Sequence, residues 1–192
     1  MANSNITKKA LAESLKELGS EKILDKITVA DITDHCGVNR QTFYYHFTDK
    51  YELLSWIYTQ ELVIPLTKDL TFDNWGDKII ELFSYMKEHK RFFMNTIKSS
   101  NDFFSEYLEE IFIELFNKAI QDLNLYNHLE DKMRDVYARF FAYGLTGVIV
   151  DWALKGMKED EEDLAKLLQN MSLSSERIGH ELYLYHKNEI KK

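Results

Sequence analysis

Apolar residues recur along most of this chain at intervals of three and four, the spacing that places them on one face of an α-helix. No stretch alternates apolar and polar residues for long enough to indicate a strand. The pattern therefore predicts an all-α protein. The expected helices cover residues 6–18, 28–36, 39–47, 50–63, 75–90, 91–98, 102–124, 128–157, 160–171 and 174–188.

Two residues are expected to end helices. Gly19 follows the first helix and suits a left-handed terminator, and Pro65 follows the fourth, where it disfavours further helix. The segment after Pro65, up to Asn74, is the best candidate for a domain boundary. We therefore expect an N-terminal domain over residues 1–63 and a larger helical domain over residues 64–192.

The segment ITVADITDHCGVNRQTFYYHFTDKYELL, residues 27–54, contains two short helix signatures on either side of Gly37. Thr28 and Asp31 have the spacing of a capping box, and Asn39 suits the N-cap of the second helix. This layout is typical of a helix-turn-helix, in which one helix supports a second that lies in the DNA major groove. Spacing points Phe43 inward and leaves a polar and aromatic face outward, made of Arg40, Gln41, Thr42, Tyr44, Tyr45 and His46.

These outward residue types suit the reading of DNA. Arg40 and Gln41 stand in the first turn, where arginine pairs with guanine and glutamine with adenine. Asn39 suits a phosphate or a base, and Thr42 and Tyr45 suit thymine methyls or the backbone. The alternative is an aromatic-rich helical hairpin in a protein–protein interface.

The net charge of −8 argues against nucleic-acid binding, but it is unevenly distributed. Residues 1–55 contain seven Lys or Arg and eight Asp or Glu, a net charge of −1. A near-neutral DNA-binding end on an acidic body predicts modest affinity and strong dependence on salt.

The larger domain is rich in aromatic residues, most of which are expected to be core. Their number also suits an apolar pocket for a small effector; the candidates for its lining are Tyr107, Tyr137 and Phe141. Gly144 and Gly147 interrupt an apolar helix, as close helix approach in a dimer requires, although packing within one subunit is the alternative. The residues expected at the dimer interface are Gly144, Gly147, Val148, Trp152, Leu164 and Leu168.

Enzymatic and metal-binding motifs are absent from the sequence. It has no GxxxxGK[ST], GxGxxG or GxSxG, and HELYLYH at 180–186 is not HExxH. The single cysteine, Cys36, is expected to be a small buried apolar residue. We therefore expect no catalytic residue, no metal site and no cofactor. Because no leader and no apolar run of about 18 residues are present, we expect a cytoplasmic protein that does not engage a membrane.

The segment VADITDHCGVNRQTFYYHFTDKYELL resembles the DNA-binding signature of the TetR family of bacterial transcriptional regulators, over about residues 7–55. Cys36 replaces the usual alanine and Asn39 the common serine, which is also a capping residue. FFAYGLTGVIVDWALKGMKE, residues 140–159, resembles a Firmicutes branch that includes regulators of dihydroxyacetone kinase operons.

The resemblance implies a homodimer that presents two recognition helices to a palindromic double-stranded operator. It implies phosphate contacts from Thr28, Tyr44, His46 and Lys50, which match family positions of that role. It also implies an effector-binding and dimerisation domain, and by family habit a repressor released by a small molecule. An activator controlled by a protein co-regulator is the alternative, and a helical adaptor or enzyme a remote one.

Overall fold

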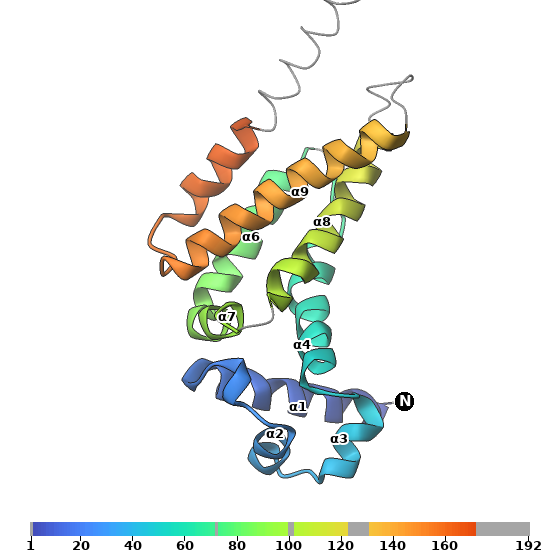
Figure 1. The fold of residues 1–192 in the computed structure, drawn as a ribbon, viewed down its shortest axis with the longest axis vertical. Coiled ribbons are helices and arrows are strands. Elements are labelled where there is room, and N and C mark those ends of the chain that lie inside the picture. Colours follow the sequence, from blue (N-terminus) through green and yellow to red (C-terminus); the bar gives the residue numbers. More distant parts are fainter. Residues whose placement is uncertain (1, 72, 100–101, 123–130, 172–192) are drawn as a thin grey trace, which may run out of the picture.

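The computed structural model describes residues 2–71, 73–99, 102–122 and 131–171, and all regular secondary structure in these ranges is helical (Figure 1). The expected all-α fold is confirmed. In chain order the α-helices are α1 (Ala2–Glu21), α2 (Val29–Cys36), α3 (Arg40–His46), α4 (Lys50–Tyr58), α5 (Ile64–Thr67), α6 (Trp75–Glu88), α7 (Lys90–Ile97), α8 (Phe103–Asp122) and α9 (Asp131–Leu154).

Three further helical segments occur among the described residues. A 3₁₀ turn (Leu24–Lys26) precedes α2, a π-helical segment (Thr59–Val63) joins α4 to α5, and residues 161–171 form another helix. The helix expected over 174–188 lies outside the described residues. None of the described helices combines the length and apolar character that crossing a lipid bilayer requires.

Helices α1, α2 and α3 form a group at one end of the molecule, and α4 runs from this group toward α6, α7, α8 and α9 (Figure 1). Helices α8 and α9 pack along each other, and α7 packs on α1. Helix α3, the expected recognition helix, therefore lies at the end of the molecule farthest from α9 (Figure 1).

The expectation that Gly19 ends the first helix is wrong, because α1 continues to Glu21. A Cβ atom at Gly19 would lie 2.8 Å from Cδ2 of Phe92, closer than van der Waals contact permits. Glycine thus allows α1 and α7 to approach closely.

The expectation that Pro65 ends the fourth helix is also wrong. Val63 and Ile64 keep helical backbone angles, and the N–H of Ile64 bonds the carbonyl of Thr59, five residues back. In a regular α-helix the Pro65 ring would collide with the carbonyl four residues earlier. The helix widens into a π turn before this proline and continues through residue 67, so one helical run joins the two ends of the molecule.

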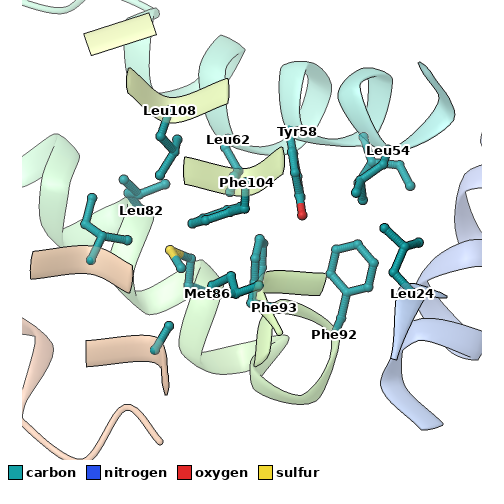
Figure 2. Packing of buried hydrophobic residues seen from close by; sticks show 14 of the residues in the cluster. Leu24, Leu54, Tyr58, Leu62, Leu82, Met86, Phe92, Phe93, Phe104 and Leu108 are labelled. Carbon is teal, nitrogen blue, oxygen red and sulfur yellow. The ribbon is translucent and has the colours of Figure 1, made fainter. Parts of the chain in front are cut away.

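Large side chains fill the space where α4, α7 and α8 meet. The Tyr58 ring lies 5.2 Å from Phe104 and 6.2 Å from Phe93, measured between ring centroids, and Phe92 lies beside them (Figure 2). The same cluster of buried residues extends to Leu24, next to α2 (Figure 2). The helix-turn-helix end and the body of the molecule therefore share one continuous core.

Candidate nucleic-acid interface

Local hydrogen bonds set the position of α2 and of the turn after it. The Thr28 hydroxyl accepts from the N–H of Asp31 (3.1 Å), and the Asp31 carboxylate accepts from the N–H of Thr28 (2.8 Å). The expected capping box is confirmed. Gly37 ends α2 with φ of 73°, a left-handed conformation that glycine adopts without steric cost. This turn lets the chain leave α2 and begin α3 within three residues.

Asn39 begins the recognition helix as the sequence predicted. Its side-chain oxygen accepts from the N–H of Thr42 (2.7 Å) and from the Thr42 hydroxyl (2.9 Å). Within the part of the chain that the structure describes, the two N–H donors of the Asn39 amide have no partner and are left for an outside one.

The recognition helix is fixed by one apolar anchor and exposes most of its other side chains. Phe43 is fully buried, whereas Tyr45 is 82% exposed and Tyr44 is 58% exposed. Arg40 and Gln41 are exposed in the first turn. Thr42 and His46 are half-buried. A short helix thus presents two large rings, an arginine and a glutamine to solvent, and the rings pack only on their neighbours Phe43 and His46 within the described residues.

A buried serine holds the supporting helix against α1. The Ser14 hydroxyl donates to the carbonyl of Ile32 (2.8 Å), and Nδ1 of His35 lies 3.1 Å from the same hydroxyl. Because these contacts lie on the inner side of α2, they orient the helix-turn-helix on α1.

Two residues with an implied phosphate role are engaged inside the protein. Lys50 donates to the carbonyls of Leu24 and Ile27, both at 2.9 Å, and burial lowers the pKa of its ammonium group. Among the described residues these two bonds leave one of its three N–H donors, so Lys50 primarily ties α4 to the turn before α2. Both donors of Thr28 are bonded to the Asp31 carboxylate, which leaves Thr28 no hydrogen for a phosphate in this arrangement.

A basic residue that the sequence analysis missed lies beside the recognition helix. The ammonium nitrogen of Lys8, on α1, is 5.2 Å from the centre of the Phe47 ring, which follows α3. The two residues are 39 positions apart, and the expected helix 6–18 gave Lys8 no distinguishing feature.

The structure does not bring together the three residues expected to line an effector pocket. The Tyr107 hydroxyl lies 2.7 Å from that of Thr59, Phe141 packs on Phe116 with centroids 5.7 Å apart, and Tyr137 is 44% exposed on α9. None of the three lines the cavity of about 430 Å³ between α1, the π segment and α6. Tyr137 lies on an exposed side of α9, which is apolar on nearly every side, so spacing could not identify the inner face of this helix.

One face of α9 carries a row of exposed apolar side chains. Phe140 is 71% exposed, and at helical spacing around it the exposed residues are Met133, Val136, Tyr137, Tyr143 and Leu154. Gly144 and Gly147 lie on the same face, and apart from the adjoining residues and backbone of α9 itself, no heavy atom of the described chain lies within 4 Å of a Cβ built on either. We call this surface, Met133 to Leu154, the α9 face.

Several residues expected at the dimer interface point elsewhere. Trp152 is only 1% exposed, its ring lies 4.9 Å from that of Phe83, and its indole N–H donates to the carbonyl of Glu159. It belongs to the core of the subunit, so placing it at an interface was wrong. Leu164 and Leu168 are also half-buried against this core, and Val148 is half-buried at the edge of the α9 face.

Among the residues that the structure describes, no three His, Cys, Asp or Glu side chains are placed to hold a metal ion. Cys36 is half-buried against the core, with Sγ 3.8 Å from the carbonyl of Thr33.

Comparisons with known proteins agree with this geometry. Residues 13–56 match the family described as "Bacterial regulatory proteins, tetR family", and residues 73–174 match the family "Transcriptional regulator C-terminal region" of the TetR group. The chain is 25% identical over 180 residues to the HTH-type dhaKLM operon transcriptional activator DhaS of Lactococcus lactis subsp. lactis (strain IL1403), covering 93% of this chain and 95% of the relative.

Two solved structures have a similar fold. The dihydroxyacetone kinase operon activator DhaS matches with a TM-score of 0.69 and 25% identity over 90% of this chain and 97% of that one. NalD, the secondary repressor of the MexAB-OprM multidrug efflux pump in Pseudomonas aeruginosa, matches with a TM-score of 0.59 and 18% identity over 89% and 96%. Since the family matches cover the helix-turn-helix and more than half of the chain, the protein belongs to the TetR family of bacterial transcriptional regulators.

Proposed function

We propose that the protein binds a palindromic operator as a homodimer, with α3 of each subunit in the major groove. The observation that carries this proposal is the outward face of α3, where Tyr45 is 82% exposed above a fully buried Phe43. Among the described residues the Tyr45 ring contacts only its neighbour His46, and most of its surface faces solvent. The family to which the chain belongs binds operators.

Within α3, the residues of the first turn recognise the DNA bases. Arg40 pairs with a guanine and Gln41 with an adenine, and each such pair discriminates by about 1–3 kcal/mol. Tyr45 and the Thr42 methyl contact thymine methyls or the backbone. The free amide hydrogens of Asn39 meet a phosphate or a base edge.

Phosphate contacts come from the sides of the same surface. Tyr44 and His46 flank the base-reading residues on α3, and Lys8 adds a positive charge from α1. The remaining donor of Lys50 adds a weaker contact. Such contacts set the register of the protein on DNA and carry little sequence information.

The second subunit binds on the α9 face. Its exposed rings supply apolar area, and the outward glycines Gly144 and Gly147 let two α9 helices approach closely. A two-fold axis through this face makes the contact self-complementary, as a symmetric dimer requires.

Operator affinity changes when an effector binds in the body. A small molecule that prefers one spacing of the two α3 helices shifts the dimer toward or away from the spacing of about 34–36 Å that successive major grooves demand. We propose repression relieved by such an effector. The relative DhaS is named as an operon activator, which favours activation as the second candidate. Control by a protein co-regulator is the signal proposed for that second candidate.

The test begins with selection of binding sites from random DNA. Gel-shift titrations then compare the wild type with Arg40→Ala, and with Arg91→Ala, which removes an exposed arginine from the body as a matched control. We expect an inverted repeat, a loss of preference at one base pair per half-site in Arg40→Ala, and no change in Arg91→Ala. A failure to enrich any sequence, or equal binding by all three proteins, would contradict the proposal.

The direction of regulation is tested separately, with a reporter gene placed behind the selected operator. Repression predicts higher expression when the regulator is removed, and activation predicts lower expression.

A further inference from the structure

A cavity of about 430 Å³ opens where the DNA-binding end meets the body. The cavity is lined by residues from four elements: Lys16 of α1, Glu61 of the π segment, Pro65 of α5, and Lys78 and Tyr85 of α6. Lys16 brings α1 to this wall, so a molecule that fills the cavity lies against both ends of the protein.

One side of the cavity is a closed set of hydrogen bonds centred on Glu61. Lys16 donates to Oε1 of Glu61 (2.8 Å) and also to Glu13 (2.9 Å), and the Tyr85 hydroxyl donates to Oε2 of Glu61. Burial opposes the charge of Lys16, yet its bonds to both glutamates outweigh that cost and raise its pKa. Each oxygen of Glu61 therefore accepts a hydrogen bond, and this side ties α1 to α6 through the π segment.

The other side has hydrogen-bond donors to spare. Lys78 donates to Glu81 (2.9 Å), and within the described residues this uses one of its three N–H donors. Its side chain is only 18% exposed, so few water molecules reach it. The His89 ring, at the end of α6, lies 4.5 Å from the Tyr85 ring and adds a further polar edge to the wall.

The remainder of the wall is apolar. Leu62, Pro65, Leu66 and Leu82 line it, and Leu62 and Leu82 also belong to the core shown in Figure 2. A half-buried ammonium group beside an apolar wall matches a ligand with one anionic head and a short apolar body.

We propose that this cavity binds a small organic anion, a carboxylate or a phosphate monoester, with its head on Lys78 and its body against Leu62, Leu66 and Leu82. The head competes with Glu81 for Lys78. Because the site includes Lys16 of α1, an occupied cavity favours one placement of the DNA-binding end over others. This consequence for DNA rests on the proposed function, whereas the binding itself does not.

The binding test uses the whole chain without DNA, by isothermal titration calorimetry. The probes are benzoate and phenyl phosphate, each compared with its neutral counterpart, benzamide or phenol. Binding of benzoate alone identifies a carboxylate site, and tighter binding of phenyl phosphate identifies a phosphate monoester site. Binding of neither anion, or equal binding of the neutral probes, overturns the proposal.

Two variants with opposite expected effects separate a ligand contact from a general loss of structure. Lys78→Met weakens anion binding by about tenfold or more, since a hydrogen bond to a charged group is lost. Glu81→Gln strengthens it, because the competing carboxylate is gone. Lys166→Met, which removes a lysine that also donates to one glutamate but lies outside the cavity, leaves it unchanged. Equal affinities in Lys78→Met and the wild type would overturn the assignment.

A gel shift with the selected operator, with and without the bound anion, then tests the coupling. A changed operator affinity in the wild type, reduced in Lys78→Met, supports it. Loss of all DNA binding would contradict the proposed function and leave the calorimetric result standing.

Discussion

Phe140→Ala is the sharpest test of how two subunits meet. Phe140 is 71% exposed at the centre of the α9 face. A phenylalanine side chain has about 200 Å² of surface, so about 140 Å² of Phe140 is exposed in each subunit and can be buried by a partner. At about 25 cal/mol per Å² this area is worth at most about 3.5 kcal/mol per subunit.

A dimer contains this contact twice, so the upper limit is about 7 kcal/mol. Even if under a third of it is realised, the loss of about 2 kcal/mol raises the dimer dissociation constant about 30-fold. The subunit itself should keep its free energy of unfolding at a concentration where both proteins are monomeric, because the ring makes little contact within it.

Sedimentation velocity across a range of concentrations measures the dissociation constant. Ile6→Ala is the matched control, since Ile6 is 64% exposed on α1, away from the α9 face. An unchanged dissociation constant in Phe140→Ala, or an equal rise in Ile6→Ala, would refute the assignment of this face.

Three further substitutions test individual contacts, each by urea unfolding. Lys50→Met should lower the free energy of unfolding by about 1–3 kcal/mol, since two carbonyls lose a charged donor, while the salt dependence of operator binding changes little; a large change in that dependence with unaltered stability would restore Lys50 as a phosphate contact. Gly19→Ala should be destabilising by up to about 2 kcal/mol, because crowding against Phe92 exceeds the gain in helix propensity of about 1 kcal/mol; a more stable variant would contradict the close packing of α1 on α7. The backbone N–H and the hydroxyl of Thr28 lower the pKa of Asp31 below its ordinary value of 3.8, so its contribution to stability is present above that pH and is lost as the pH falls through the lowered pKa; Asp31→Asn should show a shallower loss of stability with acid than the wild type, and parallel curves would contradict this role.

Local signals predicted the helix-turn-helix well. The capping box at Thr28, the turn at Gly37 and the cap at Asn39 each depend on residues within three or four positions, so a sequence reading can identify them. The fold class followed from periodicity for a similar reason.

Contacts between distant segments could not be predicted. Lys50 bonds carbonyls more than twenty positions earlier, and nothing near residue 50 indicates this. Gly19 resembled a helix end, yet glycine is needed there because the Phe92 ring of α7 packs against it, a contact that the sequence alone cannot reveal. In α9 the apolar residues surround the helix, so periodicity could not separate the buried Trp152 from the exposed Phe140.

The central claim is that α3 of each subunit lies in the major groove of one operator. Methylation protection measures this directly, because dimethyl sulfate modifies guanine N7, which faces that groove. On a selected operator we predict protected guanines in two half-sites related by symmetry and centred about 34–36 Å apart, with one guanine per half-site exposed again in Arg40→Ala. Unprotected guanines on a bound operator, or a single protected half-site, would contradict the account.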